Sequence, residues 1–381
     1  MPSRSRLLEI AQVFLKLGTI SVGGPAAHVA LMEDELVTRR RWVSRDDFLD
    51  LLGATNLIPG PNSTEMAISL GYLRGGWAGW FIAGAAFILP AASITAMCAW
   101  FYVHGGTLPQ AARWWFGIPP ATIAVIAFAA WRLTRTAVKS HQQAIIGLAV
   151  AIAALVGVSE IVALFMGGLL GMFWLRRAVP RVAGRVVVAA ALILSGGVSL
   201  AAAVTATRVP ITLWNLGAVF LKVGSVLYGG GYVLVAFLEA ALVRERGWLT
   251  ERQLLDAIAV GQFTPGPVLS TATFIGYVLA GGPGAIVATI GIFLPSFLFV
   301  AYLQAILPRI RRGVWAAAFL DAVNVAAIGL MVAVTIRLTA NLTDWRQWTI
   351  AAAALAAGVL WKPHAGWLIV GGAMAGAVLV R

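Results

Sequence analysis

The sequence predicts an all-α polytopic membrane protein built from two homologous halves. Two observations lead to this fold class: 60% of the 381 residues are apolar and only 11% are charged, and apolar segments interrupted by Gly and Pro recur at one fixed offset. Soluble domains are about 45–50% apolar and about 25% charged. The composition therefore excludes a water-soluble enzyme or a DNA-binding module. We expect the lipid bilayer as a partner and no nucleic acid.

Uninterrupted apolar segments long enough to span a membrane recur along the whole chain. A span needs about 20 mostly apolar residues, and the candidates are 76–103, 115–131, 142–158, 159–175, 186–206, 284–306, 314–336, 348–360 and 364–380. Four further segments are apolar but broken, two in each half: 7–37, 48–73, 211–243 and 254–280. Because no long polar stretch separates these segments, we expect no soluble domain.

The broken segments correspond to each other at an offset of 206 residues. Between positions 14 and 61, 18 of 48 ungapped positions are identical to the residue 206 positions later. The identities include charged residues and the triplets Pro59-Gly60-Pro61 and Pro265-Gly266-Pro267, which similar hydrophobicity alone would not align. The duplication predicts three parts: an N-terminal repeat at 1–185, a linking transmembrane helix at 186–210 and a C-terminal repeat at 211–381.

Basic loops predict how the two halves are oriented. Lys and Arg gather in cytoplasmic loops, which accounts for a net charge of +13 in a membrane protein. Loop 38–45 is basic, whereas acids balance most of the arginines of its counterpart 244–252. Conversely, 308–312 is basic and its counterpart 104–113 carries a single arginine. Equivalent loops are therefore expected on opposite sides, as in an inverted-topology repeat, with the N-terminus cytoplasmic and the C-terminus periplasmic.

Paired helix breaks predict a transport site. Non-helical backbone at membrane depth is tolerated only where it is buried in protein or lines a cavity, and symmetric breaks mark binding sites in transporters with repeats. Residues 62–64, after Pro61, predict a new helix whose N-terminus attracts an anion. We expect a binding site for an oxyanion formed by Gly23, Gly24, Pro25, Gly60, Asn62, Ser63, Thr64, Lys16, Lys222, Gly229, Gly230, Gly266, Ser270 and Thr271. For any one break, simple kinking or close helix packing is the alternative.

Ionisable residues inside the apolar segments are further candidates, because burying charge in a membrane is costly. Lys16 and Lys222 occupy equivalent positions and either lie beside the anion or extend to the interface. Four residues are candidates for a proton carrier or a salt bridge: His28, Glu33, Glu65 and Glu239. For Glu33 and Glu239 the favoured interpretation is a salt bridge, either to those lysines or to the arginines that follow. For His28 the favoured interpretation is a satisfied core histidine. Asp50 and Asp256 are expected to serve helix N-termini.

Catalytic and cofactor sites are not expected. Cys98 is the one cysteine, the four histidines are scattered, and no metal-ligand spacing or phosphate loop occurs. We therefore expect no catalytic residues, no metal and no cofactor. An intramembrane enzyme or a lipid-handling protein is a weaker alternative, since such enzymes need a nucleophile or a metal cluster.

The block from Phe14 to Gly76, with its GGP and PGPNSTE motifs, resembles the signature region of the chromate ion transporter (CHR) family. The block from Phe220 to Gly282 is similar to the C-terminal repeat of that family, so the chain resembles its long, two-domain form. The resemblance implies a bacterial inner-membrane protein that confers chromate resistance by export. It implies functional roles for residues 23–25, for the arginines before Trp42, and for residues 59–65. The second half has Gly231 where the first has Pro25, and Val268-Leu269 where the first has Asn62-Ser63. These departures favour a site in the first half.

The sequence thus predicts a secondary transporter of chromate, with sulfate or a related oxyanion as the alternative substrate and a passive channel as the alternative mechanism. Moving one charge through 100 mV is worth about 2.3 kcal/mol, so a dianion that leaves an inside-negative cell gains about 4.6 kcal/mol. Export can therefore run on the membrane potential. Proton coupling and assembly into a homo-oligomer are left open by the sequence.

Overall fold

The computed structural model describes residues 3–21, 25–105, 109–175, 210–228, 233–310, 314–361, 363 and 365–379. All regular secondary structure in these ranges is helical. The predicted linking helix 186–210, apart from its last residue, lies outside them, as do Gly23, Gly24, Gly229 and Gly230. Every other uninterrupted span predicted above coincides with a helix, as the next two paragraphs show.

The helices of the N-terminal repeat (repeat 1, residues 1–185) come in a fixed order along the chain. They are α1 (Arg4–Ile20), α2 (Pro25–Met32), the π-helical turn η1 (Glu33–Arg39), α3 (Arg45–Thr55), α4 (Asn62–Gly105), α5 (Pro109–Ala137), α6 (His141–Leu155) and α7 (Glu160–Leu175).

The C-terminal repeat (repeat 2, residues 211–381) has the same order. Its elements are α9 (Leu213–Val226), α10 (Leu234–Leu238), the π-helical turn η2 (Glu239–Arg244), α11 (Glu251–Phe263), the short 3-10 turn η3 (Val268–Ser270), α12 (Thr271–Ile310), α13 (Val314–Thr339), α14 (Trp345–Trp361) and α15 (Ala365–Leu379). Even the π-helical turns begin 206 residues apart, at Glu33 and Glu239.

Equivalent residues begin equivalent helices. The Ser44 hydroxyl accepts a hydrogen bond from the N–H of Asp47 and starts α3. Its counterpart Thr250 accepts from the N–H of Gln253 and starts α11, and the Gln253 side chain binds back to the Thr250 N–H. This reciprocal pair satisfies two N–H groups that the helix itself leaves unpaired.

Each Pro-Gly-Pro triplet is followed by a short helix that folds back at a glycine. In α4 the chain leaves helical geometry at Gly75 and Gly76, and Gly76 has a φ of 59°. In α12 the same departure occurs at Ala280 and Gly281, where φ is 62°. The two arms then touch through glycines: a Cβ added at Gly71 would collide with the carbonyl of Gly79, so only glycine permits this approach. Residues 62–74 therefore form a half-length helix before the long arm of α4.

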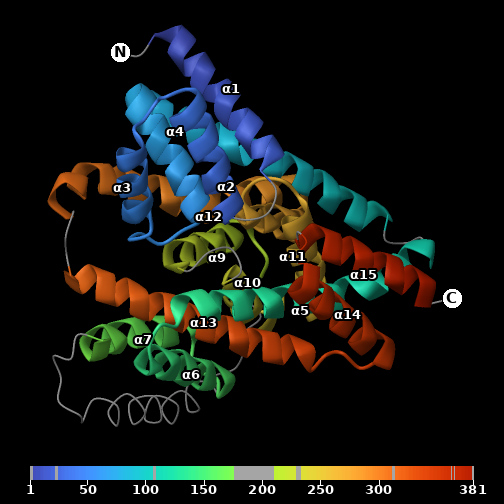
Figure 1. Cartoon of the computed structure of the whole chain (residues 1–381). Helices are drawn as coiled ribbons and strands as arrows, with labels where there is room; N and C mark the ends of the chain where they lie inside the picture. Colours follow the sequence, from blue (N-terminus) through green and yellow to red (C-terminus); the bar gives the residue numbers. More distant parts are fainter. Residues whose placement is uncertain are drawn as a thin grey trace.

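The two repeats exchange helices. The long helix α5 of repeat 1 packs against α14 and α15 of repeat 2, and α13 of repeat 2 packs against α6 and α7 of repeat 1. Figure 1 shows α13 lying beside α6 and α7, and α15 beside α5. Glycines make these crossings close: a Cβ at Gly329 would strike the carbonyl of Gly147, and one at Gly372 would lie 2.8 Å from the carbonyl oxygen of Gly117.

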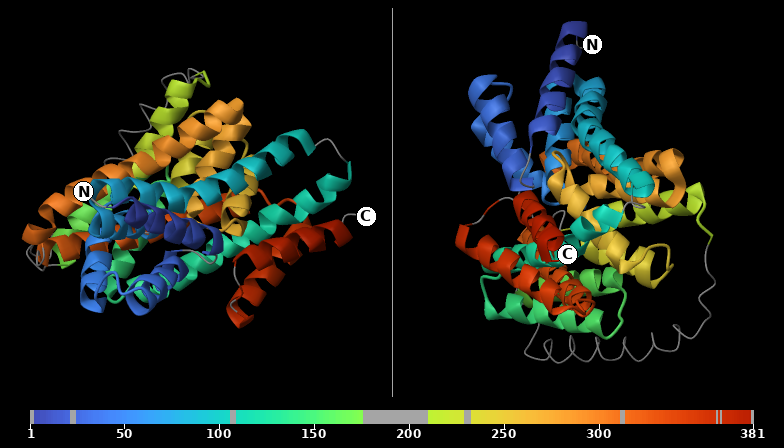
Figure 2. Two further views of the ribbon diagram at one scale, coloured as in Figure 1. Left: turned by 90° about the horizontal axis from the view of Figure 1, so that it is seen from above. Right: turned by 90° about the vertical axis from the view of Figure 1, so that its right-hand side faces the viewer.

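Equivalent long helices run in opposite directions. In Figures 1 and 2 the cyan end of α4 lies on the side opposite the orange end of α12. Four helices in the described part of the chain are long and apolar enough to cross a membrane: 62–104, 116–135, 268–304 and 318–339. The outward faces remain apolar, with Phe81 61%, Leu298 56% and Trp367 70% exposed. An apolar surface of this extent belongs against lipid.

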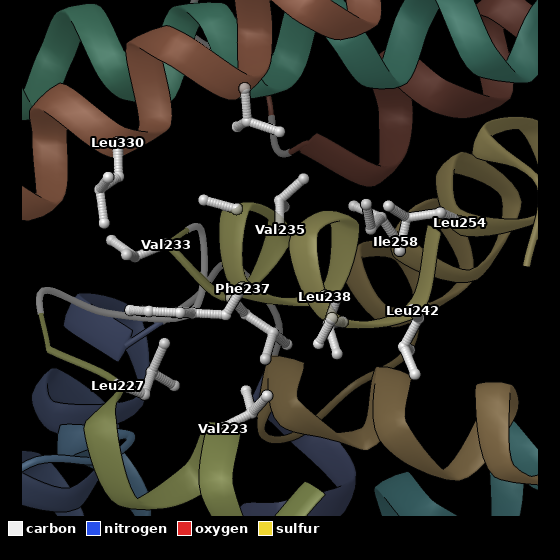
Figure 3. Close-up of a cluster of buried hydrophobic side chains, with 14 of the residues drawn as sticks. Val223, Leu227, Val233, Val235, Phe237, Leu238, Leu242, Leu254, Ile258 and Leu330 are labelled. Atoms are coloured by element: carbon white, nitrogen blue, oxygen red, sulfur yellow. The ribbon is translucent and has the colours of Figure 1, made fainter. Parts of the chain in front are cut away.

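The largest buried cluster surrounds α10, the short helix of repeat 2. All five residues of α10 are buried, and its Phe237 and Leu238 side chains lie among Leu227, Val233 and Leu242 (Figure 3). Helices α9, α11 and α13 supply the surrounding side chains. A helix that is apolar on all sides is stable only when it is enclosed in this way. Helix α10, which follows Gly229 to Gly231 in the sequence, is therefore held inside the protein.

Candidate functional site

The two Pro-Gly-Pro breaks are held by reciprocal hydrogen bonds between the repeats. The N–H of Gly60 donates to the carbonyl oxygen of Leu227, at 2.7 Å, and the N–H of Gly266 donates to that of Ser21, also at 2.7 Å. Gly266 is the equivalent of Gly60, and Leu227 is the equivalent of Ser21. A contact that is repeated with the partners interchanged is the mark of a twofold relation. Each break thus lies against the end of the other repeat's first helix.

The surroundings of the two breaks differ in polarity. Gly60 has a φ of 140°, and a Cβ added there would collide with Oε1 of Glu65 and lie 2.8 Å from Oγ of Ser296. At Gly266, where φ is 90°, an added Cβ would instead lie 2.7 Å from the methyl group of Ala91. Both glycines have a positive φ, but only at Gly60 do a carboxyl group and a hydroxyl group lie nearest to an added Cβ.

The start of α4 buries three consecutive polar side chains. Ser63 is 1% exposed, and Thr64 and Glu65 are both 0% exposed. Asn62 lies differently: its Oδ1 accepts from the Thr55 hydroxyl at 2.6 Å, and its Nδ2 donates to Asn56 at 2.7 Å. Asn62 thus ties the end of α3 to the start of α4, while the next three residues turn into the protein.

Helix α2 brings His28 to this helix start. Nδ1 of His28 lies 3.2 Å from Oγ of Ser63, and the ring packs edge-on against Phe87. His28 is 1% exposed, and its Nε2 has no hydrogen-bond partner among the described residues. Two residues that the sequence marked independently, 35 positions apart, are therefore in contact.

Buried polar atoms without partners gather at the breaks. More than 90% of buried polar groups in proteins are hydrogen-bonded, so unpaired ones point to a ligand or to water. Within the described ranges the unpaired atoms on these segments are Ser21 Oγ, His28 Nε2, Thr64 Oγ1, both Glu65 carboxyl oxygens, Gln262 Nε2, Ser270 Oγ and Ser296 Oγ. Hydroxyl and N–H donors dominate this set, which is the chemistry of an oxyanion site.

Repeat 2 contributes unpaired donors of its own, on Gln262, Ser270 and Ser296. Ser270 is buried and its hydroxyl is unpaired. The Thr271 hydroxyl, by contrast, donates to the carbonyl oxygen of Val268, at 2.8 Å. In the triplet Gly23-Gly24-Pro25 of repeat 1, the structure describes Pro25, which begins α2. Both repeats therefore present unpaired donors, but repeat 2 has Leu234 and Leu269 where repeat 1 has His28 and Ser63.

The predicted lysines lie apart from this set. Lys16 is half exposed and forms an ion pair with Glu35 at 3.0 Å, and Arg40 binds the same carboxylate at 2.8 Å. Lys222 is exposed. Glu33 pairs with Arg45 at 3.4 Å. The partner of Lys16 is therefore Glu35, a residue that no sequence pattern marked.

Glu239 takes part in a buried ion cluster. Its carboxylate binds Nε of Arg244 at 2.9 Å and Nη1 of Arg337 at 3.3 Å. Both arginines also contact Glu160 at the start of α7. The cluster links the two repeats, because Glu160 belongs to repeat 1 and the other three residues belong to repeat 2.

The expectation that Asp256 serves a helix N-terminus is wrong. Thr250 caps α11, and Asp256 is its sixth residue, 1% exposed, with Oδ2 accepting from the Tyr102 hydroxyl at 3.0 Å. The charge lies one turn beyond the helix start, in the apolar run LLDAIAV, and that position was the signal that sequence reasoning missed. Ser296, in an otherwise apolar helix, carried no such signal. No group of three His, Cys, Asp or Glu able to hold a metal occurs in the described part of the chain.

Comparison with known proteins decides the family. The profile described as "Chromate transporter" matches residues 8–172 and again residues 214–377. The chain belongs to the chromate transporter family. It is accordingly an all-α polytopic membrane protein, and the two matched stretches contain the two sets of equivalent helices described above.

Three relatives illustrate the range of the chromate transporter family. The chain is 34% identical to the chromate transport protein of Cupriavidus metallidurans over 336 residues, 87% of this chain and 82% of the relative. It is 34% identical to the chromate transport protein of Pseudomonas aeruginosa over 334 residues, 85% of this chain and 79% of the relative. An uncharacterised transporter of Methanocaldococcus jannaschii is 28% identical over 347 residues, 89% of this chain and 85% of the relative. No solved structure matches the chain.

Proposed function

We propose that this protein exports chromate from the cytoplasm as a secondary transporter in a bacterial inner membrane. One observation supports this proposal most: in a chain of the chromate transporter family, the start of α4 buries unpaired donors where the two repeats cross. His28 contacts Ser63 at the start of α4, and the next residue of that helix, Thr64, has an unpaired hydroxyl. A helix N-terminus with added hydroxyl donors favours a doubly charged oxyanion.

The anion site is assigned mainly to repeat 1. Ser63 and Thr64 supply hydroxyl groups, His28 supplies Nε2, and Gly60 allows the chain to turn beside them. Sulfate has the same charge and a similar shape, so a site made of hydroxyl and N–H donors discriminates between the two anions only modestly. Sulfate is therefore expected to compete with chromate.

The membrane potential supplies the driving force for export. A dianion that leaves an inside-negative cell gains about 4.6 kcal/mol per 100 mV, whereas import would need more than two coupled protons to offset that cost. Helix directions support an inverted arrangement, because the equivalent helices α4 and α12 run in opposite directions (Figure 2). With the basic loop 38–45 on the cytoplasmic side, the N-terminus is cytoplasmic.

Uptake of labelled chromate into everted membrane vesicles tests the proposal. We expect accumulation that stops when the membrane potential is collapsed and that excess sulfate reduces. In the Ser63→Ala/Thr64→Ala double variant we expect at least a tenfold loss, since each hydrogen bond to a charged ligand is worth about 1.5–3 kcal/mol. Accumulation that persists without a potential would contradict potential-driven export.

A matched control removes two hydroxyls that face away from the site. Thr19 and Ser225 are equivalent residues whose hydroxyls donate to the carbonyl oxygens of Leu15 and Leu221 on their own helices. The Thr19→Ala/Ser225→Ala variant should accumulate chromate like the wild type. If the Ser63/Thr64 variant transports equally well, the anion site lies elsewhere than at the start of α4.

A further inference from the structure

Glu65 has the most isolated carboxyl group at the crossing of the two repeats. It is 0% exposed, and neither oxygen has a hydrogen-bond partner among the described residues. No lysine or arginine of the described chain forms an ion pair with it, whereas Glu239, equally buried, binds two arginines. An ionised carboxylate without a partner is too costly to bury, so Glu65 is neutral in this conformation.

The position of Glu65 connects it to both repeats. Its carboxyl group lies beside Gly60, whose N–H is bound by Leu227 of repeat 2, and beside Ser296 of α12. It follows Ser63 and Thr64 on the same helical turn, so it borders the proposed anion site. Residues of both repeats therefore lie beside the Glu65 carboxyl group.

The other titratable groups near Glu65 are few. Tyr228, at the end of the α9 segment, lies close enough to interact with Glu65 electrostatically, and His28 of α2 contacts Ser63. On α1, Lys16 and Glu9 are held in the partly exposed ion cluster with Arg40. On α3, Asp46 and Asp47 lie at the exposed start of the helix. On α11, Arg252 is exposed and Asp256 is hydrogen-bonded to Tyr102. The titratable side chains that the structure describes on α12 are Tyr277 and Tyr302, and the helix also contains Arg309 near its end.

Repeat 2 has no counterpart of this carboxyl group. The residue equivalent to Glu65 is Thr271, and the residue equivalent to Ser296 is Ala91. The Thr271 hydroxyl is already bonded to Val268. Among the described residues, the buried carboxyl group beside the Pro-Gly-Pro glycine is therefore a feature of repeat 1 and not of repeat 2.

We propose that Glu65 is the proton-binding group of the anion site: chromate binds while Glu65 is protonated, and that proton crosses the membrane with the dianion. The inference rests on the proposed function. A protonated carboxyl group has an O–H that can donate to an oxyanion, whereas a carboxylate would repel it. The anion and the proton therefore bind together, and each transport event moves one net negative charge instead of two.

The net charge moved in each transport event is measured in proteoliposomes that contain the purified full chain. A potassium gradient with valinomycin sets the membrane potential, and the potential at which chromate flux stops is recorded for a tenfold chromate gradient at alkaline pH. For one net charge this reversal potential is about 59 mV, and for two it is about 30 mV. We expect about 59 mV for the wild type, and a further shift of about 59 mV when a pH difference of one unit is imposed.

In the Glu65→Gln variant we expect a reversal potential of about 30 mV that does not respond to the pH difference. Glu65→Thr introduces the residue that repeat 2 has at this position and serves as a second variant if the glutamine variant does not fold. Glu245→Gln is the matched control, because Glu245 lies in an exposed ion pair with Arg246 and should keep the wild-type reversal potential.

The outcomes separate the two proposals. Absence of chromate flux in the wild type contradicts the proposed function itself. Wild-type flux that reverses at about 30 mV regardless of pH leaves chromate transport standing and overturns the role of Glu65. A pH response that survives in Glu65→Gln and disappears in His28→Gln also overturns it, because the proton then resides on the histidine.

Discussion

The N–H of Gly60 and the carbonyl oxygen of Leu227 are 2.7 Å apart, although the residues come from different repeats. This hydrogen bond requires the chain to turn at Gly60 with a φ of 140°, which L-residues rarely adopt. The same bond between Gly266 and Ser21 completes the pair. The geometry of the proposed anion site thus depends on contacts that neither repeat forms alone.

Gly60→Ala should lower chromate transport more than tenfold. The added methyl group would collide with the Glu65 carboxyl group, and the positive φ adds strain of about 1–3 kcal/mol. Gly53→Ala is the matched control, because nothing lies within 4 Å of a Cβ at Gly53 on α3. Vesicle uptake at equal expression compares the two variants, and equal transport by both would contradict the assignment of the site to this break.

Removing Arg337 should destabilise the protein strongly. Glu160 and Glu239 are almost fully buried and would keep only Arg244 as a shared partner. Breaking a buried ion cluster costs about 3–5 kcal/mol, so Arg337→Met should lower the midpoint of thermal unfolding in detergent by several degrees.

Arg45→Met is the control for that measurement. The side chain of Arg45 is 74% exposed in its pair with Glu33, and exposed pairs contribute about 0–1 kcal/mol. Its unfolding midpoint should stay close to that of the wild type. Equal shifts in both variants would mean that burial does not distinguish the two ion pairs.

Tyr102→Phe should destabilise the contact between α4 and α11. Asp256 would lose the hydroxyl bonded to its Oδ2 and remain buried, at a cost of about 1–3 kcal/mol. Tyr302→Phe on α12 is the control, because Tyr302 is 67% exposed. Thermal unfolding followed by tryptophan fluorescence should show a lower midpoint for the Tyr102 variant alone, and an unchanged midpoint there would show that the hydroxyl is dispensable.

Equivalent loops should react from opposite sides of the membrane. In a Cys98→Ser background, Arg39→Cys and Glu245→Cys place single thiols at positions 206 residues apart. An impermeant maleimide should label the first only in everted vesicles and the second only in intact cells or spheroplasts. Labelling of both from one side would rule out the inverted arrangement.

Much of the fold could be predicted from the sequence because it depends on local patterns. The lengths of the apolar segments predict where the helices lie. The offset of 206 residues identifies equivalent positions in the two repeats, down to single glycines such as Gly60 and Gly266. The helix exchange could not be predicted in this way. An offset shows which residues are equivalent, but it does not show whether α5 packs on its own repeat or on the other one.

The candidate site was predictable in its backbone and less so in its charges. His28 and Ser63 were marked separately, and their contact became visible only in the structure. Glu33 pairs with Arg45, and Lys16 pairs with Glu35, a residue that the sequence did not mark. Ser296 became visible only through its place beside Gly60, since a lone serine in an apolar helix has no pattern of its own.

The exchange of helices has a consequence for biosynthesis. When repeat 1 has been inserted, α6 and α7 can pack against each other, but the main contacts of α5, α6 and α7 form only when α13, α14 and α15 emerge. Tertiary assembly therefore waits for nearly the whole chain. Two fragments produced from separate genes, 1–185 and 186–381, should each be degraded alone and should restore one another when made in the same cell.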